Sequence, residues 1–76
     1  MKQVATADSK LPLLISASES AALCEISVRQ WWRWDSEGAV PRAARIGRTK
    51  RWRLDELERW CAAGCPRRAE WEVQDA

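Results

Sequence analysis

One stretch limits what this chain can fold into more than any other, the run of tryptophans and arginines between Ser27 and Gly38. Ser27 is followed three residues later by Gln30, which is the spacing of a helix N-terminal capping box. Gly38 stands where a left-handed residue would end the helix, and Pro41 follows as a stop. The sequence therefore predicts one short helix between Ser27 and Gly38.

The faces of this helix differ strongly. A period of 3.6 residues places Trp31 and Trp34 together on an apolar face. Arg29 and Arg33 lie one turn apart on the opposite face, with Trp32 and Gln30 on the flanks. Arg and Gln side chains can read guanine and adenine edges in DNA. Exposed arginines are also common on helices that bind nothing, so the helix alone leaves both interpretations open.

Charge along the chain favours the nucleic-acid interpretation. Residues 29–53 carry eight Lys or Arg against Asp35 and Glu37, a balance of +6, whereas the rest of the chain has a balance of −4. Most charge runs are only solvated surface. Here the basic run coincides with a predicted helix and a predicted hairpin, which is typical of a surface that binds a polyanion.

A second helix is predicted directly before the first. Residues 16–19, Ser-Ala-Ser-Glu, form another capping box, and the helix they begin extends to about Glu25. Ile26 then stands as a hydrophobic staple before the N-cap Ser27. With so short a connection, the two helices must meet at a steep angle, as in a helix-turn-helix whose second member is the recognition helix. Glu25 occupies a position where Gly is frequent in such turns. The apolar residues 11–15 predict a short strand or an extended lead-in.

A hairpin is predicted after Gly38. Gly47-Arg48-Thr49 is expected at its tip, and the sequence Arg51-Trp52-Arg53 alternates as in a half-buried strand. Because a two-stranded ribbon is marginal alone, we expect it to pack on the helices through Val40, Ile46 and Trp52. A basic hairpin after a helix-turn-helix is a wing, and wings contact the DNA backbone or the minor groove.

The C-terminal part predicts a third helix over residues 54–64, whose apolar face holds Leu54, Leu57, Trp60 and Cys61. Pro66 is expected at the first position of one further helical turn. Trp71 in that turn either extends the core or contacts a partner, and residues 73–76 are expected to fray. The resulting domain plan is a disordered tail at 1–10, a DNA-binding domain at 11–64 and an extension at 65–76.

Several kinds of protein are disfavoured. No apolar run reaches the roughly 18 residues of a membrane span, and no signal-peptide pattern is present, so we expect a cytoplasmic protein. With no His, no phosphate-binding Gly loop and no nucleophile beside a base, we expect no enzyme and no cofactor. The odd count of three cysteines argues against a disulfide framework, and no fourth ligand completes a zinc site. Cys24 and Cys61 are therefore predicted to be small buried hydrophobic residues.

The motifs together resemble a known family. They are Leu14-Ile15-Ser16 with Glu19-Ser20-Ala21-Ala22-Leu23, Ile26-Ser27 with Trp31-Trp32-Arg33-Trp34, Glu37-Gly38 with Pro41, Arg45-Ile46-Gly47 with Arg51-Trp52, and Leu54-Asp55-Glu56-Leu57-Glu58-Arg59-Trp60. Over roughly residues 11–64 this set resembles small excisionase and AlpA-like proteins, which are related to the MerR winged-helix type. Val28 departs from the pattern, since a polar residue is common there. The resemblance implies a DNA-binding protein that helps an integrase excise an element or regulates transcription.

We therefore predict a mainly α fold with a small β-hairpin, a winged helix-turn-helix of three helices plus wing. It would bind double-stranded DNA as an excisionase acting architecturally with an integrase, with several copies on adjacent sites. One alternative is an AlpA-like transcriptional regulator that contacts RNA polymerase, and another is a protein-interaction module that does not bind DNA. The candidate DNA-binding residues are Ser27, Arg29, Gln30, Trp32 and Arg33 in the recognition helix and Arg42, Arg45, Arg48, Lys50 and Arg51 in the wing.

Overall fold

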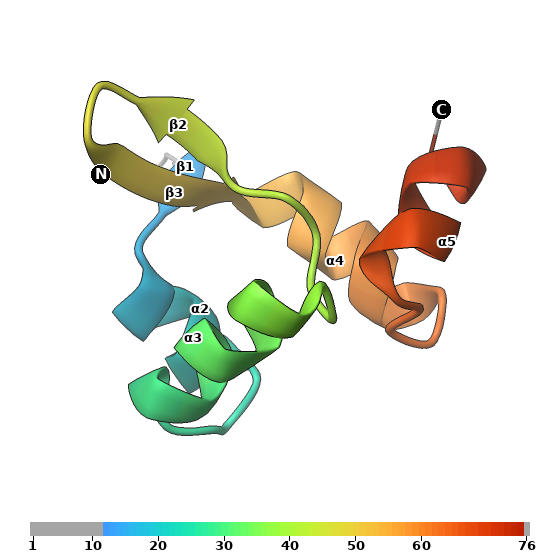
Figure 1. Cartoon of the computed structure of the whole chain (residues 1–76), viewed down its shortest axis with the longest axis horizontal. Coiled ribbons are helices and arrows are strands. Elements are labelled where there is room, and N and C mark those ends of the chain that lie inside the picture. Colours follow the sequence, from blue (N-terminus) through green and yellow to red (C-terminus); the bar gives the residue numbers. More distant parts are fainter. Residues whose placement is uncertain (1–11, 76) are drawn as a thin grey trace, which may run out of the picture.

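The computed structural model describes residues 12–75. The predicted tail at residues 1–10, and Leu11 and Ala76, lie outside them. Within the described residues the chain forms four helices and one three-stranded antiparallel sheet (Figure 1). In chain order the elements are β1 (Leu14–Ile15), α2 (Ala17–Leu23), α3 (Val28–Glu37), β2 (Ala44–Ile46), β3 (Thr49–Arg53), α4 (Leu54–Ala62) and α5 (Arg68–Gln74).

Both predicted N-caps are confirmed. The Ser16 hydroxyl accepts from the Glu19 backbone N–H at 3.0 Å, and the Glu19 carboxylate accepts from the Ser16 N–H at 2.9 Å, which completes the capping box of α2. The Ser27 hydroxyl accepts from the Gln30 N–H at 3.0 Å and caps α3. Helix α2 ends at Leu23, two residues earlier than expected, because Glu25 adopts the left-handed conformation, with φ of 58°.

The end of α3 also follows its sequence signal. Gly38 is left-handed, with φ of 72°. Its N–H donates to the Asp35 carbonyl at 3.2 Å, and the Ala39 N–H donates to the Trp34 carbonyl at 2.8 Å. These two bonds form a Schellman motif, which satisfies carbonyls that the helix end would leave unpaired.

The sheet adds a third strand, β1, to the predicted ribbon, and β1 lies in the apolar run where a short strand was one of the two expectations. Strand β3 lies in the centre, and β1 and β2 pair with it on either side, with Ile15 opposite Trp52 and Ile46 opposite Thr49. The hairpin loop is therefore Gly47-Arg48, and Gly47 supplies the positive φ, 62°, that a type II′ turn needs at its first loop position. The predicted third tip residue, Thr49, already belongs to β3.

The prediction that Ile46 anchors the hairpin in the core is wrong. Its side chain is 61 % exposed, because β2 ends at the hairpin tip, which projects beyond the helices (Figure 1). Val40 and Trp52 are buried as predicted. The hairpin therefore packs through its base, where the Trp52 indole N–H donates to the Pro41 carbonyl at 3.0 Å.

Tryptophan supplies most of the core volume. Trp31, Trp52, Trp60 and Trp71 are all at most 4 % exposed, and they pack with Ile15, Ala17, Ala21, Val40 and Leu57. Trp31 and Trp52 meet edge to face, with ring centroids 5.3 Å apart. Each indole buries an area that several smaller side chains would otherwise have to supply, which suits a chain of this length.

The C-terminal segment is more ordered than the sequence suggested. Helix α4 ends at Ala62, before left-handed Gly64 and Cys65. Helix α5 is longer than a single turn and includes Val73 and Gln74, which were expected to fray. Pro66 is not at its first position, since Arg67 is the N-cap. Trp71 docks on the core, where its indole N–H donates to the Glu56 carboxylate at 3.0 Å.

Candidate nucleic-acid interface

The outer face of α3 carries the predicted recognition residues. Arg29 and Arg33 are exposed, and Trp32, on the same side, is 43 % exposed. Gln30 is only half-buried, so its amide remains accessible, whereas the Ser27 hydroxyl is occupied in capping the helix. The exposed set therefore offers guanidinium and amide donors beside an aromatic ring.

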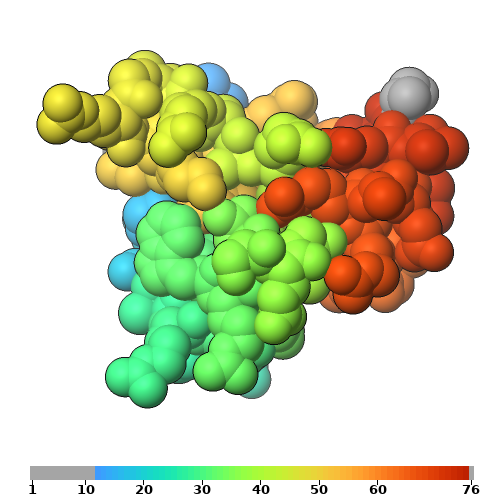
Figure 2. Space-filling model, in the orientation of Figure 1, coloured from blue at the N-terminus to red at the C-terminus, as the bar shows by residue number. Residues whose placement is uncertain are grey.

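The hairpin places further arginines next to this face. Arg45 and Arg48 are exposed on β2 and on the loop. Arg51 is half-buried on β3, and its guanidinium donates to the Lys50 carbonyl at 3.0 Å. Figure 2 shows that α3, in green, and the hairpin, in yellow, present their side chains on the same face of the molecule.

A shallow groove joins the helix to the hairpin. It is lined by the N-cap Ser16 and by Ala17 and Ser18 of α2, by Val28 and Trp32 from α3, and by Arg48, Thr49, Lys50 and Arg51 from the hairpin. Trp32 meets the buried Trp52 at a steep angle, with ring centroids 5.7 Å apart. The Lys50 ammonium lies 5.7 Å from the Trp32 ring centroid, within range of a cation–π contact. Trp32 is thus held in place while part of its ring stays open to the groove.

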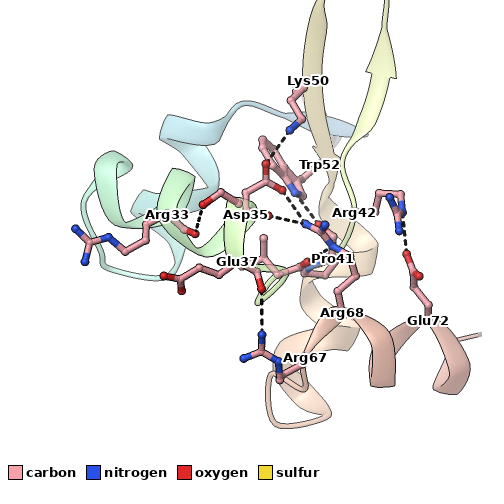
Figure 3. Close-up of polar contacts among 12 residues, drawn as sticks. Arg33, Asp35, Glu37, Pro41, Arg42, Lys50, Trp52, Arg67, Arg68 and Glu72 are labelled. Carbon is pink, nitrogen blue, oxygen red and sulfur yellow. Dashed lines mark hydrogen bonds and ion pairs between the residues drawn. The ribbon is translucent and has the colours of Figure 1, made fainter.

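Two predicted wing cations form ion pairs with acidic side chains of the same chain. The Lys50 ammonium lies 2.7 Å from the Asp35 carboxylate, and Arg42 lies 2.9 Å from Glu72 (Figure 3). The Arg42 side chain is largely exposed, so its pair is a surface pair. Lys50 is two-thirds buried and its partner is 9 % exposed. The structure thus gives Lys50 an internal role that the sequence did not predict.

Asp35 is the buried centre of a network that sequence reasoning missed. Its carboxylate also accepts from Arg68 at 2.9 Å, and Arg68 further donates to the Val40 and Asp35 carbonyls (Figure 3). Arg67 donates to the Glu37 carbonyl at 3.0 Å. The network ties α3 to both the hairpin and α5. One signal was available: Asp35 follows Trp31 by four residues, so it lies on the buried side of the helix.

The three cysteines gather on a different part of the surface. Cys24, Cys61 and Cys65 line an apolar hollow beside Trp34 and Trp60. The predicted burial of Cys61 is wrong: its side chain is exposed because this hollow opens to solvent, and Cys24 is only half-buried. Partial desolvation in this hollow raises the pKa of each of the three thiols above the ordinary value of a cysteine. Within residues 12–75 no group of three cysteine, histidine or carboxylate side chains is placed to hold a metal ion.

The longest helix in the part of the chain that the structure describes is α3, with ten residues, and none there has the length and apolarity needed to cross a membrane.

Comparison of the chain with models of protein families, with curated protein sequences and with solved structures finds no match. The family resemblance of the sequence motifs therefore stays a prediction.

Proposed function

We propose that this chain is a sequence-specific, double-stranded DNA-binding protein of the winged helix-turn-helix type. In this proposal α2 and α3 are the helix-turn-helix, α3 is the recognition helix, and the β2–β3 hairpin is the wing. Strand β1 completes the sheet behind the wing, and α5 supports the end of α3.

The observation that carries the proposal is the distribution of unpaired arginines. Five cations form ion pairs within residues 12–75: Arg42, Lys50, Arg53, Arg59 and Arg68. In the same residues six arginines have no ion pair: Arg67, which donates to the Glu37 carbonyl, and Arg29, Arg33, Arg45, Arg48 and Arg51. All of them except Arg67 belong to α3 or to the hairpin. Such an unneutralised cluster attracts a polyanion.

The division of labour follows from where the arginines stand. A recognition helix presents its outer face to base edges in the major groove, so Arg29 and Arg33 would contact guanine. Gln30 would contact adenine from the flank. Arg45, Arg48 and Arg51 would neutralise phosphates from the wing, because wing contacts are mostly to the backbone. Trp32, at the floor of the groove between them, would pack on a deoxyribose.

Within this class we infer the role of an excisionase, which the motif resemblance implies. A single domain of this size covers few base pairs, so several copies would bind adjacent sites and bend the DNA for an integrase. Control of transcription with RNA polymerase is the alternative, since it would use the same surface. An integrase gene beside this one in the genome would favour excision, and footprints that show one isolated site on unbent DNA would contradict the architectural role.

The DNA interface is tested by alanine substitutions at matched arginines. On a site selected from random duplexes, Arg33→Ala should weaken binding by roughly 1–3 kcal/mol and relax the preference at one base position. Arg48→Ala should weaken binding to all sequences similarly. Arg53→Ala is the control, because Arg53 lies on the same hairpin but is paired with Asp55 at 3.6 Å. Intact specific binding by Arg33→Ala, or an equal loss in the Arg53 control, would show that the recognition surface is assigned wrongly.

A further inference from the structure

A second surface, formed by β1, α2 and α4, has a chemistry unlike that of the arginine face. Two hollows on it share Pro12, Leu54 and Glu58 in their linings, so they lie side by side. Leu13 and Leu14 complete one half, and Ala22 and Leu23 the other. None of the arginines that lack an ion pair within residues 12–75 lines it. We call this surface the β1–α2–α4 groove.

The groove is apolar and open. Leu13 and Leu23 are 85 % and 63 % exposed, which places both among the most exposed large hydrophobic side chains of the described residues. Both stand on fixed backbone: the Leu13 carbonyl accepts from the Leu54 N–H at 3.1 Å, and Leu23 belongs to α2. Apolar side chains held in the open over one continuous surface are typical of a protein-binding site.

The rim of the groove is acidic. Glu19 stands on the α2 side, and Asp55 and Glu58 stand on the α4 side. Arg53 is the cation of the lining, and it is paired with Asp55 at 3.6 Å. An acidic rim around an apolar floor repels nucleic acid, and it complements a segment whose apolar side chains are flanked by Lys or Arg.

We propose that the β1–α2–α4 groove binds a basic amphipathic helix of a partner protein. The apolar stripe of that helix would contact Leu13, Leu23 and Leu54, and its flanking Lys or Arg side chains would meet Glu19 and Glu58. This is the helix-in-groove mode of recognition, in which residues at i, i+3 and i+4 are the anchors. In Figure 1 β1 and α2 lie behind β3 and α3, and the lining of the groove shares no residue with the groove between α3 and the hairpin. DNA on the arginine face would therefore leave the β1–α2–α4 groove accessible.

The inference goes beyond the proposed DNA binding and does not depend on it. The probe is a short synthetic peptide with leucines at i, i+3 and i+4 spacing and lysines on the flanks. A matched peptide with glutamates in place of the lysines is the control. Binding to the full chain is measured by calorimetry, and the contact surface is mapped from amide shifts in ¹H–¹⁵N NMR spectra.

The lysine peptide should bind one to one and shift amides of β1, α2 and the start of α4. Leu13→Ser combined with Leu23→Ser should weaken it about tenfold, since both leucines contribute apolar contact area. These side chains are exposed, so the variant should keep the wild-type fold. Glu58→Gln should weaken binding less and reduce its dependence on salt. Val73→Ser, at an exposed position on α5, should change nothing.

The glutamate peptide binding as tightly as the lysine peptide would overturn the proposal, as would shifts confined to other elements. Self-association through the groove, seen as a mass that rises with concentration in sedimentation, would also overturn the proposal, because the occupant would then be a second copy of this chain. Contacts between the groove and residues 1–10 of the same chain would overturn it as well, because the groove would then be occupied from within the chain. In every case DNA binding by the leucine variant should equal that of the wild type, so failure of this inference is distinguishable from failure of the proposed function.

Discussion

Replacing the buried Asp35 with Ala should destabilise the domain far more than removing an exposed charge does. The carboxylate is 9 % exposed and pairs with Lys50 at 2.7 Å and Arg68 at 2.9 Å. Removing one member of a buried ion pair costs about 3–5 kcal/mol, because the remaining charges stay desolvated without a partner. The Lys50 side chain is one-third exposed and can turn to water, and Arg68 keeps two carbonyl acceptors. We therefore expect the lower end, about 3 kcal/mol.

That loss is large for so small a protein. At roughly 0.05–0.15 kcal/mol per residue, a chain of 76 residues has a free energy of unfolding of roughly 4–11 kcal/mol. A change of about 3 kcal/mol corresponds to a fall in Tm of roughly 12–24 °C. Thermal and urea unfolding followed by circular dichroism would measure it.

Asp55→Ala is the matched control for this experiment. Asp55 also pairs with two arginines, Arg53 and Arg59, but it is 62 % exposed, so water replaces the lost contacts. Its Tm should stay close to that of the wild type. If Asp35→Ala lowers Tm no more than Asp55→Ala does, the buried network does not hold α3, the hairpin and α5 together as argued.

Three further predictions concern the helix ends and the thiols. Gly38→Ala should lower stability by about 1 kcal/mol in urea unfolding, because its φ of 72° strains any residue with a Cβ; an unchanged midpoint would contradict the left-handed cap. Ser16→Ala should lower it by about 1 kcal/mol through loss of the capping box, whereas Ser18→Ala, on the exposed side of the same helix, should not. Cys24 should react with iodoacetamide at pH 8 more slowly than free glutathione, since partial burial raises the pKa of its thiol and lowers the thiolate fraction; faster reaction would contradict this.

Features encoded by neighbouring residues could be predicted from the sequence. The caps at Ser16 and Ser27, the left-handed Gly38 and the apolar face of α3 all depend on spacings of three or four residues. Strand alternation likewise placed Trp52 in the core. These signals act within one element, so they hold whatever the rest of the chain does.

Features that depend on how elements meet could not be predicted in the same way. The alternation of β2 does not reveal that Ile46 stands at a tip beyond the helices. The sequence predicted Lys50 to be a free cation, because its partner Asp35 lies 15 residues away in the chain. The second partner of Asp35, Arg68, lies 33 residues from it, so the buried network could not be predicted either. The exposure of Cys61 follows from the hollow between α2 and α4. The sequence thus supplied the candidate arginines, while the structure separated those that are paired internally from those that are not.

The most direct test of the central claim is a salt series of binding titrations on random-sequence duplex DNA, followed through quenching of the tryptophan fluorescence, to which the exposed Trp32 contributes. Random-sequence DNA offers Arg29 and Arg33 no matched base, so on it these two would meet phosphates as the wing arginines do. If the five arginines of α3 and the hairpin without ion pairs then neutralise five phosphates, the logarithm of affinity should fall against the logarithm of salt concentration with a slope of about −4.5. Arg48→Ala should reduce that slope by about one. No binding at low salt, or a slope near zero, would contradict the account and favour a protein-interaction role for the chain.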